Sequence, residues 1–171
     1  MLDTRELGRR PGSQQEVSRS VPAPADLGIE VLKVPEGSPV ELDLRLEAVM
    51  EGVLVTGSAT AKLVGECVRC LDPIADEMSA RFQELYVYDD KDHDPDEDNE
   101  VSQLESDLLD LEPILRDAVV LALPFRPLCQ DDCPGLCIEC GARLADDPGH
   151  THEAAIDPRW ATLEALKQDE D

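Results

Sequence analysis

Six cysteines occur in three closely spaced pairs, and they are the residues of this chain best suited to chemistry. The pairs are Cys67-x-x-Cys70, Cys129-x-x-x-Cys133 and Cys137-x-x-Cys140. In a Cys-x-x-Cys turn both sulfurs project to one side at the separation that a tetrahedral zinc ion needs, and backbone amides donate to the thiolates. Gly141, directly after Cys140, permits the crowded or left-handed backbone that such a turn requires. Bound zinc is therefore the leading chemical hypothesis.

Two histidines in the loop after Cys140 extend the list of candidate metal ligands. The eight candidates divide into two sets of four, which predicts two ions: Cys67, Cys70, Cys129 and Cys133, and then Cys137, Cys140, His150 and His152. A rival arrangement groups Cys129, Cys133, Cys137 and Cys140 around one ion and leaves Cys67 and Cys70 out. One or two zinc ions are expected. Complete sets of four ligands leave no open position for a substrate, so the expected zinc is structural.

The overall charge excludes broad classes of function. Lys and Arg total 15 against 39 Asp and Glu, a net charge of -24, so the average surface repels polyanions. Only 3% of residues are aromatic, too few for the base-stacking platforms of single-stranded RNA binders. The first residues lack an export signal, and no run approaches the roughly 18 apolar residues of a membrane span. We expect a cytoplasmic protein without membrane contact, whose thiols stay reduced.

The sequence favours a binding protein over an enzyme. It contains no phosphate-binding Gly-x-x-x-x-Gly-Lys, no dinucleotide-binding Gly-x-Gly-x-x-Gly and no Gly-x-Ser-x-Gly elbow. A thiol oxidoreductase using Cys67 and Cys70 would need them at a helix N-terminus in a thioredoxin-like pattern, whereas their surroundings have strand character. We therefore expect no enzymatic activity and no small-molecule substrate.

The remaining pattern predicts an α+β fold: an antiparallel, barrel-like sheet with a few helices and zinc-binding cysteine-rich loops. Residues 1–25 carry little apolar periodicity and are expected to form a flexible arm before a single domain over 26–171. Apolar residues alternate with charged ones from Val40 to Ala48, and extended segments are also expected at 27–34, 53–64 and 74–88. A turn at residues 50–52 should join two of these strands in a hairpin.

The second half of the chain combines charge, helix and cysteine-rich segments. Between Asp89 and Glu112, twelve acidic residues and one lysine give a net charge of -11, and we expect an acidic loop over 89–107. Asp110 is positioned to cap a helix over residues 111–123. The cysteine-rich zinc segment covers 129–152, and Asp157 is expected to open a last helix that ends near Lys167.

Three motifs, in order, resemble those of the bacterial YceD family. They are Gly65-Glu-Cys-Val-Arg-Cys-Leu71, Ala122-Leu-Pro-Phe-Arg-Pro-Leu-Cys-Gln-Asp-Asp-Cys-Pro-Gly-Leu-Cys-Ile-Glu-Cys-Gly-Ala-Arg-Leu144 and Asp157-Pro-Arg-Trp160. The opening residues 2–12 resemble the actinobacterial branch. Similar members carry a Cys-x-Cys pair where this chain has His150-Thr-His152, and zinc accepts imidazole in place of thiolate.

This resemblance implies a role in the accumulation of large-subunit ribosomal RNA, hence in ribosome biogenesis, without enzymatic activity. Because ribosomal proteins are strongly basic, we expect the acidic segment to attract a basic large-subunit ribosomal protein or a pre-ribosomal particle. The alternative is direct binding of ribosomal RNA through a local patch of arginines from the N-terminal arm together with Arg69, Arg81 and Arg126.

Overall fold

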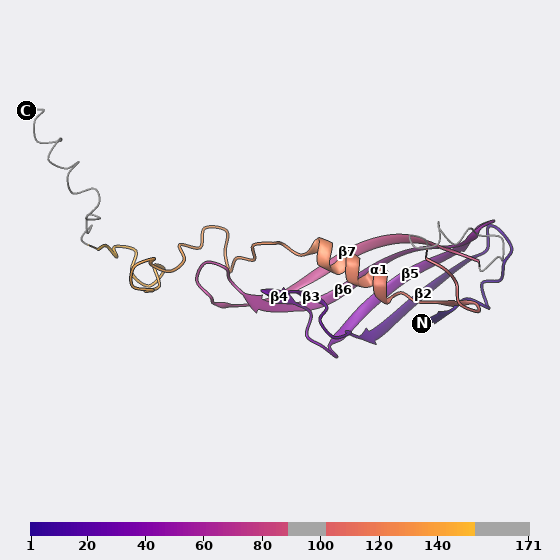
Figure 1. The fold of residues 1–171 in the computed structure, drawn as a ribbon, viewed down its shortest axis with the longest axis horizontal. Coiled ribbons are helices and arrows are strands. Elements are labelled where there is room, and N and C mark those ends of the chain that lie inside the picture. The colour runs from indigo at the N-terminus through magenta and orange to yellow at the C-terminus, as the bar shows by residue number, and fades with distance from the viewer. Residues whose placement is uncertain (89–101, 153–171) are drawn as a thin grey trace, which may run out of the picture.

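The computed structural model describes residues 1–88 and 102–152, which form an open antiparallel sheet with one helix lying on it (Figure 1). Three consecutive long strands form most of the sheet: β5 (Pro39–Ala48), β6 (Gly52–Glu66) and β7 (Pro73–Val87). The strand β2 (Gln14–Pro22) pairs with β5, and the short strands β3 (Gly28–Ile29) and β4 (Leu32–Lys33) continue the pairing beside the end of β6. A separate small sheet joins β1 (Leu2–Asp3) to β8 (Leu108–Leu109).

The alternating sequence of β5 produces a sheet with one buried and one polar face. Side chains of successive residues in a strand point to opposite faces. In β5 the apolar members Val40, Leu42, Leu44 and Leu46 are at most 6% exposed, while Glu41, Asp43, Arg45 and Glu47 face outward. Cross-strand pairing places Ala59, Val55 and Phe82 on the same buried face. The strands expected from residues 40–48, 53–64 and 74–88 are confirmed.

The expected closure of the sheet into a barrel is wrong. β2 and β7 lie at opposite edges of the sheet and do not pair with each other. The sheet has few long strands, and its inner face is covered by the helix α1 (Glu112–Ala122), which packs mainly against β7 (Figure 1). Within the described residues the fold is therefore an open antiparallel sheet with one helix.

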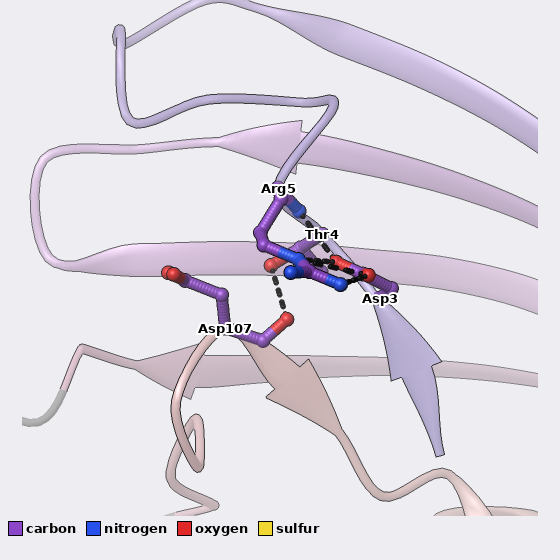
Figure 2. Close-up of polar contacts among 4 residues, drawn as sticks. All are labelled: Asp3, Thr4, Arg5 and Asp107. Carbon is purple, nitrogen blue, oxygen red and sulfur yellow. Dashed lines mark hydrogen bonds and ion pairs between the residues drawn. The ribbon is translucent and has the colours of Figure 1, made fainter.

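The first 25 residues, expected to be a flexible arm, contain β1 and β2 and contribute to the core. Leu2 and Leu7 are 4% and 7% exposed. Thr4 fixes this segment to a distant one, because its backbone N–H and its hydroxyl both donate to the carbonyl of Asp107, at 3.0 and 2.9 Å (Figure 2). The apolar residues of this segment are few and widely spaced, so the sequence did not reveal β2, a strand that is only partly buried on one side.

The helix is close to the one expected over 111–123, but its N-cap is Leu111 and not Asp110. The carboxylate of Asp110 accepts a hydrogen bond from the N–H of Glu112 at 3.1 Å, and Leu115 and Val119 are buried against the sheet. No helix of the described residues is long and apolar enough to cross a membrane. Most of the expected acidic loop, and the expected helix from Asp157 to Lys167, lie outside the described residues.

Two tyrosines near the end of β7 provide a test of this packing. The Tyr86 hydroxyl donates to the carbonyl of Asp110 at 2.8 Å, whereas the buried Tyr88 hydroxyl has no hydrogen-bond partner among the described residues. Burial, reinforced by the charges of Glu84 and Asp110, raises the pKa of Tyr86 to about 12. This tyrosine is thus held neutral in the folded chain at pH values where the unfolded chain ionises it.

We predict that Tyr86→Phe lowers the free energy of unfolding by about 1 kcal/mol at neutral pH, because the partly buried hydrogen bond to the carbonyl of Asp110 is lost. A raised folded-state pKa gives stability that is complete below the unfolded-state value of about 10 and is lost as pH rises from there toward 12. The difference between the two proteins should therefore shrink above pH 10. Denaturant titrations across this range measure both effects. Tyr88→Phe is the control and should cost much less at neutral pH; an equal cost would contradict the assignment.

Candidate metal centres

The first pair of cysteines lies in the loop that connects β6 to β7. The loop is narrow because the N–H of Cys67 donates to the carbonyl of Asp72 at 2.8 Å and that of Leu71 donates to the carbonyl of Cys67 at 2.9 Å. Leu71 has a φ of 62°, in the left-handed region, which turns the chain after the second cysteine. Both sulfurs are thereby held at the same end of the sheet.

The second pair of cysteines reaches this loop from the segment that follows α1 (Figure 1). The N–H of Val68 donates to the carbonyl of Pro127 at 3.0 Å, and the guanidinium of Arg69 donates to the carbonyl of Cys133 at 2.8 Å. Leu128 and Leu136 pack beside Cys133, which is 2% exposed. Backbone and apolar contacts together thus dock the segment onto the hairpin loop.

Four sulfurs meet at this junction, and we call the group Cys67, Cys70, Cys129 and Cys133 centre 1. All four lie within 4.8 Å of one another. The sulfurs of Cys67 and Cys133 are 3.8 Å apart, and those of Cys70 and Cys129 are 3.5 Å apart. Four thiolates at zinc–sulfur distances of about 2.3 Å would be separated by roughly 3.8 Å, whereas a disulfide requires about 2.05 Å. The geometry suits a tetrahedral metal ion, and the six cysteines are free of disulfides.

A second group lies beyond centre 1 along the chain and farther from the sheet, and we call Cys137, Cys140, His150 and His152 centre 2. Two backbone hydrogen bonds close its Cys-x-x-Cys turn. The N–H of Cys137 donates to the carbonyl of Ala142 at 2.8 Å, and the N–H of Gly141 donates to the carbonyl of Cys137 at 2.9 Å. Gly141 has a φ of 73°, as expected from its place after the pair.

The two histidines complete centre 2 through their Nε2 atoms. Nε2 of His150 is 3.2 Å from the sulfur of Cys140 and 2.9 Å from Nε2 of His152. Their Nδ1 atoms face carboxylates, since His150 lies 3.7 Å from Asp147 and His152 lies 3.4 Å from Glu139. Metal-binding histidines commonly place a carboxylate at the second ring nitrogen, which orients the ring. These ring orientations therefore suit a metal ion on the Nε2 side.

A hydrogen bond and an ion pair join the loop of centre 1 to the residues around centre 2. The N–H of Leu136 donates to the carbonyl of Arg69 at 3.1 Å, and Arg143 forms an ion pair with Asp72. Gly135 lies close enough to Arg69 that an added Cβ would come within 3.1 Å of its carbonyl oxygen, at a φ of 82°. The loop of centre 1 thus also supports the start of centre 2.

Backbone hydrogen bonds lower the pKa of one cysteine in each centre. Burial opposes ionisation of Cys67, but the backbone N–H groups of Cys129, Cys70 and Arg69 lower its pKa to about 6. Backbone N–H groups of Cys140 and Glu139 likewise lower the pKa of Cys137 to about 6. Four thiolates so close together would repel one another, and a divalent cation at their centre removes that repulsion.

The structure assembles all eight candidate residues in the two-set arrangement, not in the rival set of Cys129, Cys133, Cys137 and Cys140. The sequence alone left these two arrangements open. It also gave no sign of the supporting residues Arg69, Asp72 and Arg143, because their contacts join segments far apart in the chain. Of the two carboxylates beside the histidines, Asp147 alone had a local signal, the spacing Asp-x-x-His.

Comparison with known proteins places these centres in a family context. Residues 55–167 match the model of a family described as large ribosomal RNA subunit accumulation protein YceD. The uncharacterized protein Rv2926c of Mycobacterium tuberculosis is 48% identical over 163 residues, which cover 95% of this chain and 78% of the relative. The protein ML1660 of Mycobacterium leprae is 42% identical, over 95% and 75%.

A more distant relative, YlbN of Bacillus subtilis, is 26% identical over 137 residues, which cover 78% of each chain. No solved structure matches the chain significantly. The matched region contains most of β6, all of β7, the helix and both metal centres. This chain therefore belongs to the YceD family.

Proposed function

We propose that each of the two centres binds one structural zinc ion. Centre 1 offers four cysteines and centre 2 offers two cysteines with two histidines, and both donor sets are common in structural zinc sites. Four protein ligands complete the tetrahedral coordination of zinc and leave no position for a substrate or a reactive water. The proposal is supported by the contact distances between sulfurs in centre 1 and by the carboxylates behind the histidines of centre 2.

We further propose that the protein is a non-enzymatic ribosome biogenesis factor that supports the accumulation of large-subunit ribosomal RNA. The observation that carries this proposal is the family match over residues 55–167. The work would take place in the cytoplasm, where ribosomes assemble and thiols remain reduced.

Its partner in this proposal is a basic large-subunit ribosomal protein or a pre-ribosomal particle, attracted by the acidic surface. The net charge of -24 gives long-range attraction to basic proteins and repulsion from free RNA. Several of the arginines considered for RNA binding are already engaged, since Arg5 pairs with Asp3, Arg9 with Asp107, and Arg69 with a carbonyl of centre 1. Direct binding of RNA is therefore the less favoured mechanism.

We predict two zinc ions per chain, and one after Cys67→Ser or Cys140→Ser, by elemental analysis of the purified proteins. Cys67→Ser should lower the melting temperature more, because centre 1 links residues 67 and 133 whereas centre 2 closes a short local loop. By the loop-closure estimate these links contribute about 4 and about 3 kcal/mol. A wild-type protein that contains no metal, or melts unchanged after chelation, would contradict the zinc proposal.

We predict that deletion of residues 89–100, which contain eight acidic residues and one lysine, reduces capture of purified large-subunit ribosomal proteins several-fold at low salt. The reduction should fade as salt screens the charges. The control replaces the same residues with a Gly-Ser linker of equal length carrying the same acidic residues. Unchanged capture by the deletion would argue against the acidic segment, and capture of ribosomal RNA fragments free of protein would favour the RNA-binding alternative.

A further inference from the structure

The edge of the sheet formed by β2 has an unpaired row of backbone groups. Within residues 1–88 and 102–152, β2 pairs with β5 alone. The hydrogen bonds between β2 and β5 begin at Ala48. The N–H of Gly12 donates to the carbonyl of Ala48 at 2.8 Å, and the N–H of Ala48 donates to the carbonyl of Ser13 at 2.9 Å. Because hydrogen-bonded positions alternate in an antiparallel pair, Val17 and Arg19 bond to β5, whereas the N–H and C=O groups of Glu16, Ser18 and Ser20 point away from the sheet.

A mainly apolar groove lies beside this edge on the inner face of the sheet, and its lining also includes Arg19, Asp110 and Glu112. It has a volume of about 220 Å³. Val21 of β2 and Leu42 and Leu44 of β5 form its floor, while Leu111 and Leu115 at the start of α1 form its side. A strand added to β2 would direct every second side chain toward this groove. Aliphatic side chains at those positions would fill it.

The outer face beside the same edge is mainly acidic, and its one nearby cation on β5, Arg45, lies opposite Glu16 and pairs with Glu47. The hydroxyl of Ser18 donates to the carboxylate of Asp43 at 2.6 Å, and that of Ser20 donates to Glu41 at 2.6 Å. Both carboxylates are on β5, and neighbouring strands lie about 4.8 Å apart. The side chains of Ser18 and Ser20, which lie between these carboxylates and the edge, are small. They leave room for a long cationic side chain from an added strand. Glu16 adds a third carboxylate on β2 itself. Lysine or arginine is therefore the fitting residue for the outer positions of an added strand.

We propose that β2 is the docking edge for an extended segment of a basic large-subunit ribosomal protein, in which lysine or arginine alternates with aliphatic residues. The segment would add a strand to β2, with its backbone bonded to Glu16, Ser18 and Ser20. Main-chain hydrogen bonds supply affinity in this mode of recognition, and alternate side chains supply specificity. The identity of the partner rests on the proposed function, while the edge itself rests on the geometry.

Charge argues against the other occupants of this edge. A second copy of the chain, paired through β2, would bring its own Glu16, Glu41 and Asp43 toward those of the first copy. The segment 89–101 has eight acidic residues and one lysine, and the segment 153–171 has six acidic and two basic residues, so both would be repelled. The opposite edge is partly used, because Val87 of β7 bonds to Ser102 and Leu104, both at 2.9 Å.

The proposal is tested by Ser18→Pro. Proline removes the N–H that points outward without removing a bond to β5, and proline is tolerated in edge strands at such positions. Ser18→Ala is the matched control, since it removes the hydroxyl but keeps the N–H. Ser79→Pro is the control on the opposite edge: Tyr88 bonds to Glu51, so the alternation directs the N–H of Ser79 away from β6. Thermal melting verifies that each variant is folded.

The probe is a labelled synthetic peptide of alternating lysine and valine, with a peptide of equal composition but separate lysine and valine blocks for comparison. Wild type, Ser18→Ala and Ser79→Pro should bind the alternating peptide, and Ser18→Pro should bind it at least about tenfold more weakly, as measured by fluorescence anisotropy. The amide signals of Glu16, Ser18 and Ser20 should shift on binding in nuclear magnetic resonance spectra. The block peptide should bind more weakly and with greater sensitivity to salt.

Equal binding by folded Ser18→Pro, or loss of binding only in Ser79→Pro, would overturn the assignment of the edge. Dimerisation through β2, seen by sedimentation and abolished by Ser18→Pro, would overturn the choice of occupant. Capture of purified large-subunit ribosomal proteins separates this proposal from the wider function. If Ser18→Pro loses the peptide but captures these proteins as wild type does, the docking surface is wrong and the proposed function stands.

Discussion

The contact of four sulfurs in centre 1 is the constraint on which the arrangement of the molecule depends. The hairpin loop between β6 and β7 and the segment after α1 are far apart in the chain, and few apolar contacts join them. Their docking relies on hydrogen bonds at Val68 and Arg69 and on the sulfur cluster. A divalent ion would turn this weak contact into a firm one, because each cysteine pair supplies half of a tetrahedron. Centre 2 depends in turn on the same loop through Asp72 and Arg143.

The sheet has one buried and one polar face, and this explains how so acidic a chain can fold. Alternation in β5 sends Val40, Leu42 and Leu44 into the core and sends Glu41 and Asp43 to water, so the carboxylates stay solvated. The buried face is then covered by two segments, by Leu2 and Leu7 near the N-terminus and by Leu115 and Val119 of the helix. The acidic face is left available for interaction.

Local patterns revealed much of the fold, while contacts distant in sequence remained hidden. Alternation identified β5, and Asp110 identified the start of α1, because these signals lie within a few residues. β2 was missed because its inner residues include Gln15 and Arg19, which break the apolar alternation at an edge strand. Barrel closure was expected because several amphipathic strands suggest it. Whether the two edge strands of a sheet pair with each other cannot be predicted from the apolar pattern of either strand.

The eight candidate ligands were recognisable from residue type and spacing, yet their grouping required the fold. Cys129 and Cys133 are close in sequence to Cys137 and Cys140, and only the hairpin loop draws them toward Cys67 and Cys70 instead. This grouping has a consequence for the newly made chain. Cys70 leaves the ribosome 59 residues before Cys129, its neighbour in centre 1. During that interval the first two thiols lack their partners, so a metal ion at centre 1 could gain all four ligands only after Cys129 and Cys133 have been synthesised.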